Sequence, residues 1–186
     1  SSDLSYIRDL PRGQTRHGDW PTNGWNQDFA WFQRDEARRF LPPKIEVGQD
    51  WEVPRFLKYR FARFHLNDYA HGECSSFDDD EITKARLTAH IVAIKQGVAE
   101  IEIDGEIANS TNRKGGRGYN AKLIGNAQYR IAEQKFEKFE LVACGTRWGR
   151  EEHNDRHNDF EPAPMGIAFV IAGKQSKERL APAQIA

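Results

Sequence analysis

Several features that would announce a function are scarce in this chain of 186 residues. It has two cysteines, Cys74 and Cys144, which are too few to build a zinc or redox framework by themselves. The sequence leaves open whether they form a disulfide or stay separate thiols. A run of about 18 apolar residues is also missing, so we expect no membrane span. Neither a Gly-x-Ser-x-Gly elbow nor a P-loop is found, and no catalytic motif identifies an enzyme.

Charge of one sign is not in excess either. The chain has 27 basic and 28 acidic residues, for a net charge of −1. This balance gives no electrostatic footprint for nucleic acid, and we expect no nucleic-acid partner. Local basic stretches, Arg38-Arg39 and Arg55 to Arg63, are interpreted as solvated helix faces.

The start of the chain bears on its compartment. It begins with Ser1-Ser2 and shows no signal peptide, which fits removal of a leader or trimming. Five tryptophans, a single methionine and many polar loops fit a secreted bacterial protein. We therefore expect a periplasmic or secreted location.

Alternation of apolar and polar residues dominates the second half of the chain. Ala99 to Asp104 alternates with period two, the pattern of a strand with one buried and one wet face. Lys95-Gln96-Gly97 predicts a tight turn, and other turns are also short, so the strands should form an antiparallel meander. The strands are predicted at about 85–95, 98–108, 119–131, 136–146 and 165–172.

Helical patterns precede the strands. Asp28 suits the cap of a short helix that runs to Phe40, before Pro42-Pro43. A second helix is predicted over 54–64, with Val53, Leu57, Phe61 and Phe64 on one face, although a strand is an alternative there.

These elements predict one α+β domain over 28–173, with a curved, half-barrel-like antiparallel sheet packed on one or two N-terminal helices. The segment 1–27 is interpreted as an extended arm that packs by its aromatic residues, chiefly Trp20 and Trp25, and 174–186 as a polar tail.

Two resemblances extend this interpretation. The stretch from Tyr129 to Ala143 resembles the strand–turn–strand of LolA-like periplasmic carriers. A longer pattern over roughly residues 50–173 is similar to a β-rich family of unknown function from planctomycete-type bacteria. It comprises Arg63 to Asp68, Phe139 to Gly149 and Pro162 to Gly166. The resemblance implies a bacterial, extracytoplasmic origin and transfers no chemistry.

Two loops contain metal-ligand side chains. The first supplies imidazole and carboxylate groups and Cys74, and the second repeats the tripeptide His-Asn-Asp. Imidazole and thiolate suit Zn or Cu, and carboxylates with amides suit Ca²⁺. The alternative for the first loop is that His65 orients the helix end by hydrogen bonds, Asp68 caps the next turn and His71 is solvated. The alternative for the second is a solvated polar loop. The candidate ligands are His65, Asp68, His71, His153, Asp155 and His157.

A third loop, 109–118, is rich in glycine and cations. Arg113, Lys114 and Arg117, together with its backbone amides, are candidates to hold an anion. A mobile hairpin loop is the alternative.

Three functions follow from these patterns. The first is a binding or structural subunit that engages a protein partner, or a second copy, through its arm and sheet. The second is a metal-dependent enzyme or metal carrier that uses the two histidine-containing loops. The third is a carrier that holds a small apolar ligand among Leu87, Ile101, Leu123 and Phe139.

Overall fold

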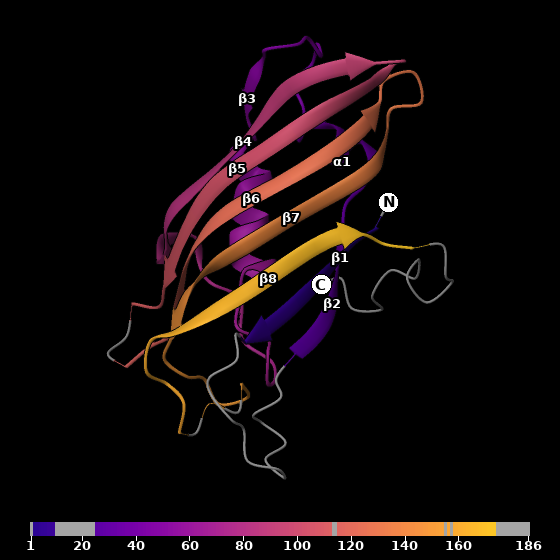
Figure 1. Ribbon diagram of the computed structural model, residues 1–186. Coiled ribbons are helices and arrows are strands. Elements are labelled where there is room, and N and C mark those ends of the chain that lie inside the picture. Colours follow the sequence, from indigo (N-terminus) through magenta and orange to yellow (C-terminus); the bar gives the residue numbers. More distant parts are fainter. Residues whose placement is uncertain (1, 10–24, 113–114, 155, 157, 174–186) are drawn as a thin grey trace.

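One antiparallel sheet organises the computed structural model, which describes residues 2–9, 25–112, 115–154, 156 and 158–173. Its eight strands lie in the order β2-β1-β8-β7-β6-β5-β4-β3. Figure 1 shows the sheet as a curved layer with the helices behind it. The strands are β1 (Ser2–Asp9), β2 (Trp25–Trp31), β3 (Asp50–Glu52), β4 (Ile82–Lys95), β5 (Val98–Ser110), β6 (Gly118–Arg130), β7 (Lys135–Trp148) and β8 (Ala163–Ile171).

The predicted meander is confirmed in β4 to β8. Each strand pairs with the next in antiparallel register, and buried and exposed residues alternate along them. The predicted turn after Lys95 is tight because Gln96 and Gly97 have φ angles of 49° and 75°, values that suit a two-residue hairpin loop. The α+β prediction with a curved antiparallel sheet is therefore correct.

The edges of the sheet come from segments without a clear period. β1 pairs with β8 and with β2, so the described parts of the segment 1–27 lie in the sheet itself. The helix predicted from Asp28 is wrong in its first part, because residues 25–31 pair with β1 as a strand. Helix α1 begins only at Arg34 and ends at Arg38. Trp20 and the predicted tail 174–186 lie outside the described residues.

The second helix is confirmed, with a change of geometry inside it. Helix α2 (Arg55–Arg60) continues as the π-helical turn η2 (Phe61–His65). The wider turn adds a residue, so the buried face passes from Leu57 and Phe61 to Leu66. Phe64 was predicted on that face and is instead exposed.

The core lies between the concave face of the sheet and the helices. The Phe61 ring meets the Phe169 ring of β8 at 5.0 Å, and Phe40 meets Phe139 of β7 at 6.1 Å. These contacts fix the helices against the sheet and leave its other face, the outer face, to solvent. Among the helices that the structure describes, none is long and apolar enough to cross a membrane.

Candidate functional site

Charged side chains are buried at one end of the sheet, which we call the polar end. There the strand ends Gly118, Trp148 and Ala163 lie in adjacent register, and the loops 66–78 and 149–162 meet over them. Its buried or partly buried polar residues are Asn67, Asp68, Arg117, Arg147, Glu151, Asn154, Arg156 and Asp159.

A two-bond ion pair joins the two loops. Arg156 donates from Nε to Asp68 Oδ2 at 2.7 Å and from Nη2 to Asp68 Oδ1 at 2.8 Å. The Arg156 side chain is fully buried and that of Asp68 is 9% exposed. Planar forks of this kind fix geometry as well as charge. The Asp68 carboxylate is therefore occupied by a guanidinium in this arrangement.

Asp159 extends the pair into a network. Its Oδ2 accepts from Arg156 Nη1 at 2.9 Å and from Arg147 Nη2 at 2.6 Å. Arg147 also donates to the carbonyl groups of Asp159 and Glu161. Two buried cations thus share one carboxylate and hold the loop that leads into β8.

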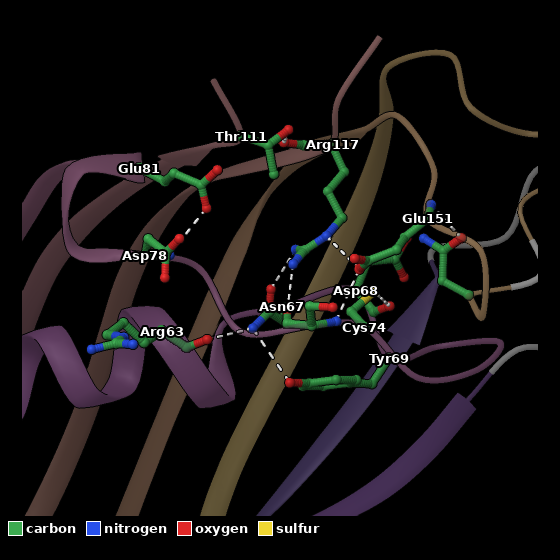
Figure 2. Close-up of polar contacts among 12 residues, drawn as sticks. Arg63, Asn67, Asp68, Tyr69, Cys74, Asp78, Glu81, Thr111, Arg117 and Glu151 are labelled. Atoms are coloured by element: carbon green, nitrogen blue, oxygen red, sulfur yellow. Dashed lines mark hydrogen bonds and ion pairs between the residues drawn. The ribbon is translucent and has the colours of Figure 1, made fainter. Parts of the chain in front are cut away.

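Arg117 also binds the loop 66–78. It donates to Asn67 Oδ1 at 2.7 Å, to Glu151 Oε2 at 2.9 Å and to the carbonyl of Ser75. Its guanidinium also lies over the Phe77 ring, 4.1 Å from the centroid. Figure 2 shows the Arg117 side chain reaching between Asn67 and Glu151. Arg117 therefore holds together three segments of the polar end.

This geometry bears on the predicted anion site. Arg117 is only 3% exposed, and its guanidinium donates to groups of the protein. Arg113 and Lys114 lie outside the described residues. The anion site stays a prediction for those two cations, whereas Arg117 has a structural role.

The six predicted metal ligands are placed as follows. Asp68 binds Arg156, and the backbone carbonyl of His153 accepts the N–H of Glu73 at 2.9 Å. Asp155 and His157 lie outside the described residues. Among the residues that are described, including His65 and His71, no three His, Cys, Asp or Glu side chains gather as a metal would require. The two loops meet through the Asp68–Arg156 ion pair and the Glu73–His153 backbone hydrogen bond, and the metal site stays a prediction.

The His65 ring packs beside two aromatic rings of the core. It lies beside Phe61 at 5.9 Å and Phe32 at 6.4 Å. Burial, with a smaller contribution from the Arg60 cation, lowers the pKa of His65 to about 4. The imidazole is therefore neutral at physiological pH.

Glycine permits the close approach of the two loops. A Cβ atom on Gly72 would lie 2.1 Å from the carbonyl oxygen of His153, too near for any other residue without a shift of the backbone. Gly149, with φ of 77°, begins the second loop and packs equally closely on Gly116.

The pKa values of two groups at the polar end, Cys74 and Glu151, are shifted in opposite directions. Burial is the main cause that raises the pKa of Cys74 to about 12, and its Sγ lies 3.0 Å from the carbonyl oxygen of Asp68. The thiol is thus protonated at neutral pH, whereas nucleophilic cysteines are thiolates. Burial also acts to raise the pKa of Glu151, but hydrogen bonds from Ser75 and the charge of Arg117 outweigh it and lower that pKa.

A shallow surface cavity of about 500 Å³ opens beside Arg117. Carboxylates and hydroxyls line it, so it favours groups that donate hydrogen bonds. Two of its carboxylates, Glu81 and Glu151, already accept backbone N–H groups of Asp78 and Ser75. The lining residues are Ser75, Ser76, Asp78, Glu81, Thr111, Asn112, Arg117 and Glu151.

The outer face of the sheet carries both ion pairs and exposed apolar side chains, and on β7 Lys138 pairs with Glu140. On β4 and β5 it carries ion pairs between neighbouring side chains, including Lys84 with Glu106. On β6, β7 and β8 the cross-strand neighbours Ile124, Val142 and Ala168 form a continuous apolar row, which we call the outer row. Ile124 is 71% exposed and Val142 is 42% exposed.

The predicted apolar-ligand residues lie on the opposite, concave face. Leu87, Ile101, Leu123 and Phe139 are all buried in the continuous core with the helices. Their packing is that of an ordinary core.

Sequence reasoning singled out Arg117 as an anion ligand but did not predict that Arg147 and Arg156 are buried. Arg147 has a detectable signal, because it continues the inward positions Phe139, Leu141 and Ala143 of β7 at a spacing of two. Arg156 lies in a loop, where no periodicity indicates burial. No protein-family model, curated protein or solved structure matches the chain.

Proposed function

We propose that this protein is a non-catalytic binding subunit that engages a protein partner through the outer face of its sheet, in an extracytoplasmic compartment. The observation that carries the proposal is the outer row, where Ile124 is 71% exposed beside Val142 and Ala168. Isolated apolar side chains are common on protein surfaces, whereas contiguous exposed apolar surface is available for contact with another molecule.

The position of the N-terminal strand β1 also supports the proposed interface. β1 pairs with β8, and Tyr6 lies opposite Ala168 in the register. The described part of the predicted arm therefore continues the sheet beside the outer row. A partner that covers both β1 and the outer row would therefore contact the arm and the sheet at the same time.

The polar end supports a binding function over an enzymatic one. Its guanidinium groups donate to carboxylates and carbonyls of the protein, and burial raises the pKa of Cys74 to about 12. Metal chemistry through Asp68 would first require loss of the two-bond pair with Arg156. These charges are therefore assigned to the stability of the fold.

Site-specific photo-crosslinking in the cells that produce the protein tests the proposal. A photoreactive phenylalanine analogue replaces Ile124 in one variant and Gln128, also exposed on β6, in the matched control. We expect one discrete protein adduct through position 124 and none through 128. An adduct with a second copy of the chain would identify the partner as a homo-oligomer. Equal products at both positions, or none at 124, would overturn the proposal.

A further inference from the structure

His90 connects an edge strand to the interior of the sheet on the outer face. It lies on β4, with β3 on one side and β5 on the other. Its Nδ1 is 2.7 Å from Asp50 Oδ1 on β3, and its Nε2 is 2.5 Å from Asp104 Oδ2 on β5. A neutral imidazole has one N–H group and cannot donate to two carboxylates, whereas an imidazolium has two. The geometry therefore fits the cation.

The charges around His90 favour the same protonation state. β3 contributes Asp50, and β5 contributes Asp104 and also Glu102, which lies opposite His90 in the register. On β4 itself, Arg86 pairs with Asp104 and offsets part of this negative charge. Carboxylates thus outnumber the cation, and hydrogen bonds to Asp104 and then Asp50 raise the pKa of His90 above its ordinary value.

Strand β3 has two side-chain attachments besides Asp50, because Trp51 Nε1 donates to the carbonyl of Arg39 at 3.2 Å and Lys58 pairs with Glu52. It is three residues long and lies at the sheet edge. Beside its own ladder, the segment is held by three backbone hydrogen bonds of 2.8–2.9 Å, from Gly48 to Ile91, from Ile91 to Gln49 and from Val53 to Leu87. Short edge strands are the elements that open locally at low cost.

We propose that His90 is a proton-operated clasp that holds the edge strand β3 on the sheet. The imidazolium bonds Asp50 and Asp104 together, and loss of its proton removes one of the two bonds. Because β3 leads through Val53 and Pro54 into α2, release of the clasp loosens the entrance to that helix. This device is independent of the partner that the outer row binds.

The pH range follows from the sign of each shift. The pKa of His90 in the folded protein lies above its ordinary value of about 6.5, so the clasp is complete below that pH and is lost as pH rises through the raised value. The pKa of Asp104 is lowered, because its bonds to His90 and Arg86 outweigh the opposing effect of burial. On the acid side the clasp therefore persists until that carboxyl is protonated.

Hydrogen exchange resolved by residue tests the clasp. The probes are the amides of Gly48, Val53 and Ile91, and the internal controls are those of Ile124 and Val142 on β6 and β7. After correction for intrinsic exchange, we expect several-fold faster exchange at the three probes when pH rises from mildly acidic to mildly alkaline, with the controls unchanged. In His90→Gln the three probes should exchange fast at both pH values. Equal protection across pH in the wild type would overturn the proposal.

The wild-type imidazole gives a second, independent measurement. Nitrogen chemical shifts of His90 report whether one or both ring nitrogens carry a proton. We expect both to be protonated at mildly acidic pH, with a midpoint above the ordinary histidine value of about 6.5. A neutral ring at mildly acidic pH would contradict the clasp even if His90→Gln failed to fold.

Discussion

The polar end and the outer row reverse the usual placement of residue types. At the polar end, Arg117, Arg147 and Arg156 are buried, and their guanidinium groups are bound by carboxylates and carbonyls. In the outer row, Ile124 and Val142 are apolar and exposed to solvent. Buried charge is costly to strip of its partners, and exposed apolar surface is available to another molecule. We therefore assign the buried charged residues to the stability of the fold and the exposed apolar residues to the proposed interface.

The largest effect is expected from Asp68→Asn. This change leaves the buried Arg156 without a full charge partner, and breaking a buried pair typically costs about 3–5 kcal/mol. Urea unfolding should show that loss as a lower midpoint with an unchanged slope. A loss within about 0.5 kcal/mol, the range of ordinary surface changes, would remove the distinction between the two regions.

The next largest effect is expected in the rates at which the two cysteines are alkylated. Burial raises the pKa of Cys74 to about 12, so its thiol is protonated at neutral pH. Alkylation of the folded protein should therefore modify the exposed Cys144 first and Cys74 only after unfolding. Peptide mapping by mass spectrometry distinguishes the two sites, with Cys144→Ser as the control. Fast modification of Cys74 would indicate a reactive thiol at the polar end.

An exposed ion pair sharpens the comparison with the buried one. Lys84→Gln breaks the pair between Lys84 and Glu106. The Lys84 side chain is 53% exposed and that of Glu106 is 35% exposed. Exposed pairs are worth about 0.2–1 kcal/mol, so urea unfolding should show a loss in that range. A loss as large as that of Asp68→Asn would mean that burial does not set the value of these pairs.

The smallest effect on stability is expected from Ile124→Lys, whose cation would lie opposite Asp104 of β5. The side chain contacts solvent over most of its surface, so the free energy of unfolding should change by at most about 0.5 kcal/mol. Binding should respond in the opposite way, because a charge in the outer row disfavours an apolar contact. Loss of the adduct formed through a photoreactive group at position 142, with stability preserved, would support the interface. A stable variant that retains this adduct would contradict it.

The sequence predicts those parts of the molecule that local patterns determine. Strands β4 to β8 alternate with period two and join through short turns, so their pairing follows from neighbouring residues. β1 and β3 lack such patterns and depend on distant partners, as Asp50 on His90 shows. Phe64 was misplaced because no local signal marks the π-helical turn that shifts the buried face.

The candidate site was likewise predictable only in part. The sequence indicates both loops as candidate sites but does not predict that they meet, and the structure brings them into contact at one end of the sheet. The bond that joins them links Asp68 to Arg156, 88 positions apart in the chain, and no spacing rule connects those residues. Residue types suggested a metal, whereas the geometry shows charge pairing for Asp68.

A double-mutant cycle between Asp68 and Arg156 tests the structural role of the polar end most directly. Urea unfolding of Asp68→Asn, Arg156→Met and the double variant gives the coupling free energy between the two side chains. If the pair acts as one unit, the double variant should lose much less stability than the sum of the single variants, with a coupling above about 1.5 kcal/mol. A coupling near zero would contradict the account, because each charge would then have a role that does not depend on the other.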